Sequence, residues 1–400
     1  MNEFEGVERG LLPALPAGLE RPLESSDVSA SVRDRIEPSF EVAFRWLERP
    51  VSTDTLAEDL PILAVILQLC GEHAQPQVWT TPESLRLSYR VQSRLKAKFE
   101  CPHMAEVIMS WHGRLLNRCL SDLRTRTRDW ADWRSHLAAA ASCIWFFDQL
   151  TLIPCRLSES LSQFLPLLLK LADDWYPPHQ EWGLLNLTKV LRYVSCQELV
   201  ANGRWNVIVN ALKGKLRSTD LKLRQTAWTS FVLVLEILEL NTVQQDSSFN
   251  ECDQFASVIL DQLQSNWSPT ERLFELQTLR QVLVLLRYRL QRWLSRLLAV
   301  LDGCLSLGSL SETDALEMLR IIRFVVSEMG DQINPHQRLI LQTLIRFEVH
   351  HKPMMGHKSI ALSECLAIVA ILREADPPRY AKLLEGHDQL RIKLKILNVT

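Results

Sequence analysis

The stretch LLKLADDWYPP (residues 168–178), followed by Trp182-Gly183-Leu184-Leu185, decides the fold. It sets a turn with two acids and two prolines between two apolar segments. A proline suits the first turn of a helix but interrupts a helix interior. Acids before a helix can accept hydrogen bonds from its first amides and favour its dipole. The stretch therefore predicts two helices joined by a tight corner, with Asp173 and Asp174 capping the second helix.

Two further corners of the same kind follow. Residues 216–221 lead into Thr226-Ala227-Trp228, and residues 265–269 lead into Phe274-Glu275-Leu276. Asp173 and Asp220 are 47 positions apart, and Asp220 and Ser268 are 48 apart. HEAT and armadillo repeats are helix pairs with periods of about 40–47 residues that bury their apolar faces on their neighbours. The spacing predicts an all-α, HEAT/armadillo-like α-solenoid of antiparallel helix pairs.

Helical patterning continues along most of the chain. The clearest apolar stripe, at i, i+3, i+4 and i+7, comprises Ile108, Trp111, Leu115, Leu116, Cys119, Leu120 and Leu123. Thr81-Pro82-Glu83 and Ser268-Pro269-Thr270-Glu271 carry the cap, proline and acid of a helix start. The second start opens a periodic segment that runs to about Leu301. No alternating strand pair and no Asn-Gly or Asp-Gly hairpin turn is evident.

These patterns predict a simple domain organisation. Residues 1–30 are rich in glycine, proline and acids and lack apolar periodicity, so we expect a flexible acidic tail. Residues 31–400 are expected to form a single elongated HEAT-like domain. Within it, residues 31–155 supply N-terminal helices, and residues 156–400 supply the repeat region with a partner-binding C-terminal half.

Composition narrows the class of protein. The 400 residues include 45 Lys and Arg and 47 Asp and Glu, a formal charge of −2. This balance gives no electrostatic reason to expect nucleic acid or an anionic membrane as partner. One compact core stops growing at roughly 250–300 residues, and a stack of helix pairs avoids that limit. With only 13 glycines, folds built on glycine-rich phosphate turns are disfavoured.

The cysteines and the start of the chain indicate the compartment. The nine cysteines are odd in number and include no C-x-x-C, as expected for buried thiols in a reducing compartment. The acidic start, Met1-Asn2-Glu3-Phe4-Glu5, is unlike a secretory signal. The longest uncharged stretch, residues 135–147, is shorter than a membrane span. We expect a soluble cytoplasmic protein that can also enter the nucleus.

Motifs for catalysis are missing. There is no G-x-x-x-x-G-K-[ST], G-x-G-x-x-G, G-x-S-x-G or H-E-x-x-H. The sharpest enzymatic alternative uses Asp173 and Asp174 to bind magnesium diphosphate, as paired helical acids do in terpenoid-type synthases. Magnesium needs several carboxylates or waters around it, and Pro177 with Pro178 leaves no helical position for a third ligand. We therefore predict no catalytic residue and no cofactor.

Two groups of His and Cys contain the side chains that ligate metals. They are Cys101, His103, His112 and Cys119, and His350, His351, His357 and Cys365. Structural zinc needs closely spaced pairs that meet as a tetrahedron. Cys119 belongs to an apolar helix stripe, and the second group surrounds a predicted loop. We predict no metal site.

Exposed tryptophans and arginines are the candidates for a protein interface. Trp175 and Trp267 stand in turns between helices, where tryptophan can anchor a partner. Arg289, Arg292 and Arg296 line one helix face, whereas Arg280 and Arg287 lie along another edge. Because phosphate tracking requires a continuous basic stripe, this divided pattern favours either pairing with acids of a protein partner or simple solvation of the arginines. The basic and apolar residues 390–397 are a poor solvent cap for a solenoid.

The corner at residues 168–191 resembles the D-D-x-x-P-x-x-K-x-x-G-x-x-x-L signature of the Tel-two-interacting protein two family. Asp173, Asp174, Pro177 and Gly183 match as a structural corner motif, and Gln180 stands in the basic position. Residues 202–212 are similar to the family's next helix start, an Asn-Arg pair before a V-I-x-x-A-L run, with Trp205 inserted.

The resemblance implies a HEAT-like, non-catalytic scaffold subunit of the Triple T (TTT) co-chaperone complex, which stabilises and matures phosphatidylinositol-3-kinase-related kinases. Its implied partners are the large HEAT subunit of that complex and, through it, the third subunit, the heat-shock protein 90 machinery and the kinases, with no nucleic acid or membrane. Two alternatives stay open. One is a generic HEAT/armadillo adaptor, and the other is a helical metal-dependent enzyme using Asp173 and Asp174.

Overall fold

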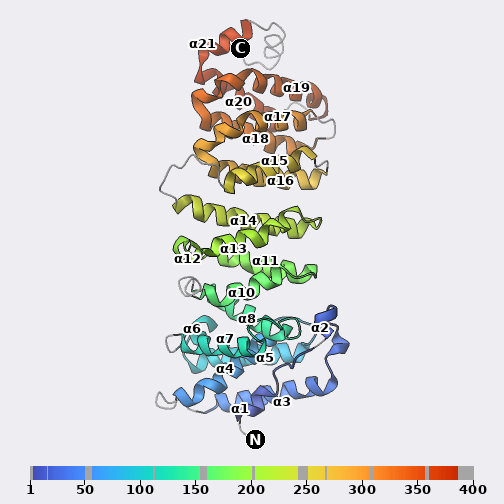
Figure 1. Ribbon diagram of the computed structural model, residues 1–400, viewed down its shortest axis with the longest axis vertical. Coiled ribbons are helices and arrows are strands. Elements are labelled where there is room, and N and C mark those ends of the chain that lie inside the picture. Colours follow the sequence, from blue (N-terminus) through green and yellow to red (C-terminus); the bar gives the residue numbers. More distant parts are fainter. Residues whose placement is uncertain are drawn as a thin grey trace. The chain divides into compact units, whose positions relative to one another are not determined.

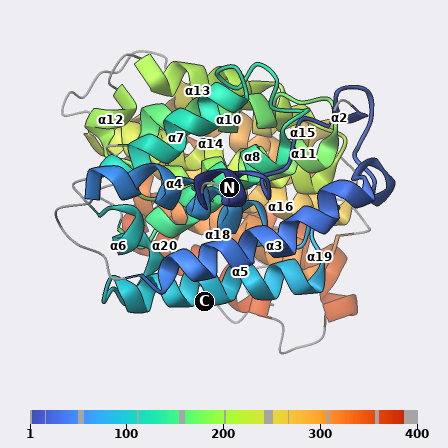
Figure 2. The ribbon, with the colours of Figure 1, turned by 90° about the horizontal axis from the view of Figure 1, so that it is seen from below.

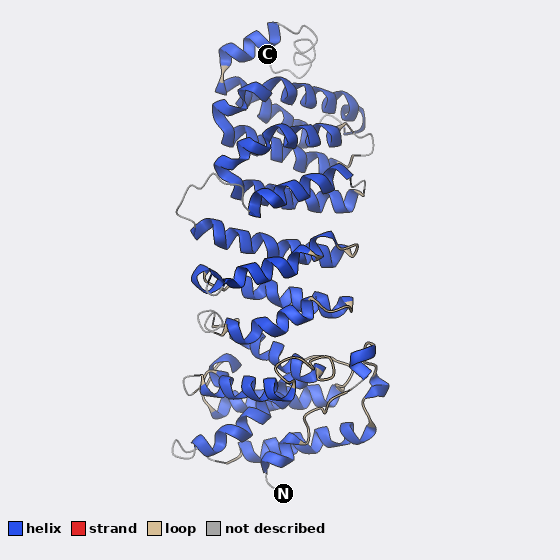
Figure 3. Ribbon diagram, viewed as in Figure 1, coloured by secondary structure: helices blue, strands red, loops and turns tan. Residues whose placement is uncertain are grey.

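The computed structural model describes residues 3–15, 17–49, 56–110, 113–153, 160–200, 203–241, 251–265, 268–306, 310–355 and 360–385. Across these ranges the regular structure consists of helices, and none of their residues lies in a strand (Figure 3). The prediction of an all-α chain is confirmed. The chain divides into two compact units, Met1–Ser230 and Phe231–Thr400.

The first unit begins with two short helices within residues 1–30, and the helices that follow them correspond to the predicted N-terminal part. Their bounds are α1 Glu3–Glu8, α2 Ala17–Glu20, α3 Ala30–Leu47, α4 Leu56–Glu72, α5 Pro82–Lys98, α6 Met104–Ile108, α7 Arg114–Arg126 and α8 Leu137–Leu150. It continues with α10 Leu161–Ala172, α11 Pro177–Leu191, α12 Cys196–Val200 and α13 Arg204–Lys213. Helix α14, Leu221–Asn241, crosses the boundary between the units.

Helices α4 and α8 form the centre of the N-terminal part. They pack against each other, and α4 also contacts α1, α5 and α7. Residues 137–147 of α8 are buried all round, as expected for a helix that lacks a polar face. Helix α5 starts as predicted, because the Thr81 hydroxyl accepts a hydrogen bond from the Ser84 amide at 3.0 Å. Figure 2 shows α5 lying beside its packing partner α3.

The first thirty residues differ from the flexible tail that we expected. Helix α1 packs on α3 and α4, and its Val7 is fully buried. The hydroxyl of Ser39 donates to the carbonyl of Gly6 at 2.8 Å, and the amide of Leu12 donates to Glu72 Oε2 at 2.8 Å. A six-residue helix is less than two turns long, so its buried face leaves no visible periodicity in the sequence. This part of the expectation is wrong.

The second unit repeats one packing rule. Its helices are α15 Glu251–Ser265, α16 Pro269–Leu286, α17 Leu294–Leu305, α18 Glu312–Met329, α19 Gln337–Met355, α20 Ile360–Ala375 and α21 Pro377–Glu385. Helix α17 packs between α15 and α19, and α18 packs between α16 and α20, which gives two layers (Figure 1). Neighbours in sequence, such as α15 and α16, also pack together as pairs. This is the arrangement of HEAT-like helix pairs.

All three predicted corners precede a helix. The first leads into α11, Asp220 leads into α14, and Ser268 leads into α16. The carboxylate of Asp220 accepts from the amide of Leu223 at 3.0 Å, as a helix cap does. The helices that follow the three corners start at Pro177, Leu221 and Pro269, so their starts recur at close to the predicted period.

The periodic segment from residue 269 to about 301 is not one helix. A 3₁₀ segment, Arg287–Trp293, separates α16 from α17. Leu286, Leu290 and Leu294 are all buried and keep an i, i+4 spacing across the change. Apolar periodicity therefore cannot reveal where the helix tightens, and the prediction of a continuous helix was wrong.

Candidate functional site

The corner between α10 and α11 is built differently from the predicted cap. The N-cap of α11 is Tyr176, and its side chain makes no capping hydrogen bond. Pro177 and Pro178 occupy the first two helical positions and have no amide N–H to donate. The next amide, of His179, bonds to the carbonyl of Tyr176 at 3.0 Å. Capping by Asp173 or Asp174 is therefore wrong, because the prolines leave no amide for a carboxylate to cap.

Asp174 instead forms a buried ionic cluster. Its side chain is about 2% exposed, and His179 Nδ1 lies 2.6 Å from Oδ2 while Arg134 pairs with Oδ1. The side-chain amide of Gln180 donates to the backbone carbonyl of Asp174. Both carboxylate oxygens thus face cationic or hydrogen-bonding groups of this chain. The cluster ties the turn before α8 to the first turn of α11, whereas Asp173 is exposed.

Gly183 lies where α11 packs closely against α10. A Cβ atom built on Gly183 would lie 2.8 Å from Leu171 Cβ and 2.9 Å from the Leu168 carbonyl oxygen, and it would also meet the amide nitrogen of Ala172. Two of these atoms belong to backbone and cannot rotate away. A side chain at this position would push the two helices apart, so the corner motif has a structural reason for its glycine.

Trp175 is half-exposed at the tip of this corner. Its ring lies 5.7 Å from that of Tyr176, measured between centroids. Beside it, a pocket of 360 Å³ is lined by the apolar or aromatic side chains of Val78, Trp79, Tyr176, Pro178 and Trp182, among others. Trp175 therefore remains an interface candidate. Trp267, the other predicted anchor, lies outside the described residues.

The three predicted arginines sit in a network of acids within the second unit. Arg289 is about 5% exposed, and its Nη2 lies 2.7 Å from Glu239 Oε1. Arg292 Nη1 lies 3.6 Å from Asp253 Oδ1, and Arg296 pairs with Asp261. Arg292 and Arg296 are partly exposed and stay candidates for a partner. Arg289 is corrected to a packing residue, because its guanidinium is buried against the protein's own acid.

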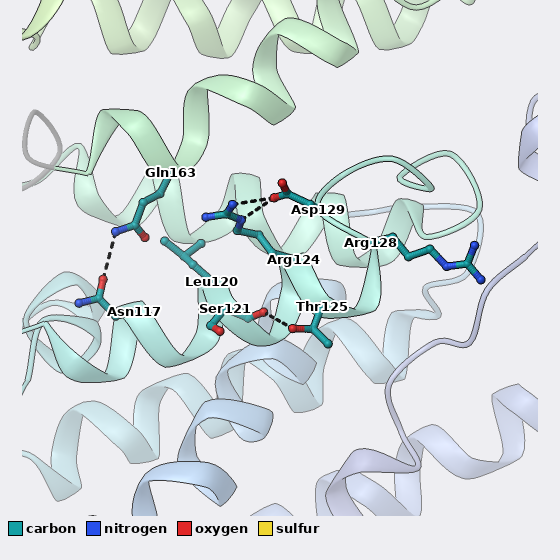
Figure 4. Close-up of a pocket in the computed structure, with 8 residues that line it drawn as sticks. All are labelled: Asn117, Leu120, Ser121, Arg124, Thr125, Arg128, Asp129 and Gln163. Atoms are coloured by element: carbon teal, nitrogen blue, oxygen red, sulfur yellow. Dashed lines mark hydrogen bonds and ion pairs between the residues drawn. The ribbon is translucent and has the colours of Figure 1, made fainter. Parts of the chain in front are cut away.

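Sequence reasoning missed a polar pocket of 520 Å³ beside α7 (Figure 4). It is lined by Asn117, Leu120, Ser121, Arg124, Thr125, Arg128, Asp129 and Gln163. Arg128, Asp129 and Trp130 are three successive residues with positive φ, at 46°, 57° and 64°. Such left-handed residues cost roughly 1–2 kcal/mol each, and strain of this kind concentrates at functional sites. The i, i+4 spacing of Arg124 and Arg128 was the available signal.

Metal ligation finds no support among the described residues. No group of three His, Cys, Asp or Glu side chains within them is arranged to hold an ion. Cys119 and Cys365 are buried, and burial raises the pKa of both thiols. His112 and the side chains of His350, His351 and His357 lie outside the description. Within the same ranges, no helix combines the length and apolar character needed to cross a membrane.

The two layers of paired helices define the class as a HEAT-like α-solenoid. Importin beta is a solved structure of similar fold, with a TM-score of 0.53 at 14% identity, covering 92% of this chain and 43% of that one. At this identity the likeness concerns the fold alone. Kap121p gives a TM-score of 0.40 at 12% identity, covering 100% of this chain and 48% of that one, and the fold assignment does not depend on it.

One curated human protein is related in sequence. TELO2-interacting protein 2 of Homo sapiens is 24% identical over 346 residues, which cover 82% of this chain and 66% of that protein. No family model matches the chain. The chain is thus similar in sequence to a protein of the family that the α10–α11 corner resembles. Together with the fold, it supports a scaffold or adaptor role.

Proposed function

We propose that this chain is a non-catalytic scaffold subunit of the Triple T co-chaperone complex, which stabilises and matures phosphatidylinositol-3-kinase-related kinases. The observation that carries the proposal is the sequence likeness to human TELO2-interacting protein 2 over 82% of the chain. The name of that relative states that it interacts with TELO2. We therefore propose a TELO2-like HEAT subunit as the direct partner. Through it the chain would contact the third subunit, the heat-shock protein 90 machinery and the kinases. We propose the cytoplasm and the nucleus as its location.

The second unit offers a surface for such a partner. Val284 on α16 and Ile360 at the start of α20 are 51% and 64% exposed, although both are large and apolar. Arg292 and Arg296 are partly exposed cations of the same unit. Stable subunit contacts bury more than about 2,000 Å² and have an apolar centre with a polar rim. We propose that the C-terminal half binds the partner through apolar contacts assisted by these two arginines. Residues 390–397, which the sequence also suggested for this contact, lie outside the described ranges.

Co-expression with a TELO2-like partner tests this function. Val284→Asp together with Ile360→Asp should abolish co-purification, because both changes place charge in the proposed apolar contact. Tyr89→Asp is the matched control, since Tyr89 is a large aromatic residue of the first unit that is 70% exposed. A soluble parent chain that never captures the partner would refute the assignment. In that case, mass spectrometry of the proteins that the chain captures from cell extract would show whether it is a generic HEAT adaptor with other partners.

The enzymatic alternative lacks a free carboxylate pair. Both oxygens of Asp174 are engaged by Arg134 and His179, and Asp173 points to solvent as an exposed side chain. A divalent ion would have to displace a buried guanidinium contact to reach Asp174. The geometry of the corner therefore favours a structural role for the two acids.

A further inference from the structure

We propose that two residues of α5, Arg90 and Arg94, here called the arginine pair, form a docking site for an acidic segment of a partner protein. Helix α5 lies beside α3 (Figure 2), and both guanidinium groups sit over an aromatic ring of α3. The site belongs to the first unit. It goes beyond the proposed scaffold role, because it does not depend on which protein binds the second unit.

The arginine pair shares one aromatic platform. The guanidinium carbon of Arg90 lies 4.8 Å from the centroid of the Phe44 ring, and that of Arg94 lies 5.7 Å from it. The two arginines are four residues apart inside the uninterrupted helix α5, so they project from one face of it. Phe44 is about 7% exposed, and its packing holds the ring in place. The fold therefore brings the two cations together over a fixed surface.

The hydrogen-bond donors of the pair are almost unused. In the described part of the chain, Arg90 forms no hydrogen bond and no ion pair. Glu48 Oε1 lies 3.8 Å from Arg94 Nη1, beyond the roughly 2.7–2.9 Å of a charge-assisted hydrogen bond. Both arginines are exposed. Since a guanidinium has five donors and binds a carboxylate through two at once, the pair can bind an incoming carboxylate without losing a hydrogen bond of this chain.

Neighbouring cations are already engaged. Arg86, one turn earlier on α5, binds both carboxylate oxygens of Glu83, at 2.9 Å and 2.6 Å. Arg49, just after α3, pairs with Glu3 at 2.5 Å. The charge of the arginine pair is balanced less well than that of these neighbours. Two like charges over one ring repel each other, and an anion between them relieves the repulsion. The pair therefore favours an anionic ligand.

The surface next to the pair has room for a peptide segment. A pocket of 740 Å³ adjoins Arg94 beside the ends of α3 and α5. Lys98 lines this pocket, and its Nζ lies 5.2 Å from the centroid of the Trp46 ring, on the same side of α5 as the pair. The ammonium donates to the carbonyls of Leu47 and Arg49, which leaves one of its three donors. The pair and Lys98 thus form a cationic row.

The length of this row favours an acidic protein segment over nucleic acid. From Arg90 to Lys98 it spans about 12 Å of helix. Glu83 precedes it by two turns, and the exposed Glu100 follows it directly. A nucleic acid carries a phosphate at every nucleotide and is bound through many of them, so its next phosphates would meet these carboxylates. A short run of glutamates can end where the row ends.

Fluorescence anisotropy of the full chain tests the site. The probe is a labelled Gly/Ser peptide with four consecutive glutamates, and its control has glutamines in their place. We expect the glutamate peptide to bind about ten-fold more tightly, and Arg90→Gln with Arg94→Gln should abolish this difference. The matched control, Lys96→Gln with Arg118→Gln, removes two charges elsewhere. Lys96 is two residues after Arg94 and so lies on the opposite side of α5, and Arg118 pairs with Asp122 on α7 at 2.9 Å.

A variant of opposite sign separates docking from general charge effects. Glu48→Gln removes the acid that competes for Arg94, so it should tighten binding of the glutamate peptide a few-fold. Thermal melting verifies that each variant is folded. Equal binding of both peptides, an equal loss in the matched control, weaker binding with Glu48→Gln, or tighter binding of an oligonucleotide at the same two arginines would each overturn the proposal. None of these outcomes depends on the TELO2-like partner.

Discussion

Replacing Gly183 by alanine tests the close contact between α10 and α11 in the first unit. The new Cβ would lie 2.8–2.9 Å from Leu171 Cβ and the Leu168 carbonyl oxygen and would also meet the backbone of Ala172. Overpacking costs about 1–3 kcal/mol, and backbone neighbours that cannot rotate away place this site near the upper end. Alanine regains about 1 kcal/mol of helix propensity. The net decrease in the free energy of unfolding should be about 2 kcal/mol.

For a unit of this length, Met1–Ser230, such a loss lowers the melting temperature by about 4–8 °C. Calorimetry and urea unfolding of the full chain measure it. Gly303→Ala is the control, because Gly303 is inside α17 and a Cβ there meets nothing within 4 Å. That change should stabilise its unit by about 0.4–1 kcal/mol. If Gly183→Ala were as stable as the parent or shared the sign of the control, the close-contact argument would be wrong.

Three further predictions concern the carboxylate of Asp174, the imidazole of His73 and the cysteine thiols. Asp174→Ala should destabilise the chain by about 3 kcal/mol in urea, because Arg134 and His179 lose the buried carboxylate that they contact. Exposed Asp173→Ala should change stability by less than about 0.5 kcal/mol, and equal effects would contradict the ionic cluster. Burial lowers the pKa of His73 to about 4, so His73 of the unfolded chain takes up a proton first as the pH falls below about 6.5. The free energy of unfolding should therefore decline by up to about 3 kcal/mol towards pH 4. The His73→Phe variant should show a smaller decline, and a pH profile unchanged by the substitution would refute this. Cys101 and Cys196 are half-buried, and mass spectrometry should find them alkylated well before the six buried thiols among the described cysteines. Early alkylation of the buried thiols would show that the core opens.

The sequence predicted the helix pairs but not the interactions that fix them. Prolines and acids at the corner mark where helices meet, since a proline constrains the backbone locally. The partners of Asp174 could not be read in this way, because Arg134 is 40 positions away and only the fold brings it close. Arg289 was predicted as an exposed cation for the same reason, as its acid, Glu239, is 50 positions away. Local signals identify elements, whereas charge pairing across elements requires the packed structure.

The polar pocket beside α7 shows a second limit of prediction from the sequence. A run of three left-handed residues at positions 128–130 contains no glycine or asparagine, the residues that usually indicate such backbone. Burial of Trp130 and Trp133 holds the turn, and that burial is a property of the packed unit. The i, i+4 spacing of Arg124 and Arg128 is visible in the sequence, but nothing in the sequence indicates that the turn brings Asp129 to Arg124.

The packed start of the chain has a consequence for its synthesis. Leu12 donates its amide to Glu72, and Arg126 Nη2 closes the group by donating to the Leu12 carbonyl at 3.0 Å and to Glu72 Oε1 at 2.8 Å. Leu12 and Arg126 are 114 residues apart. At 5–20 residues per second, the ribosome needs roughly 6–23 s to make the interval between them. Glu72 is made 54 residues before Arg126, so for roughly 3–11 s of that interval its carboxylate lacks the guanidinium. Leu12 therefore reaches its final contacts long after it has been synthesised.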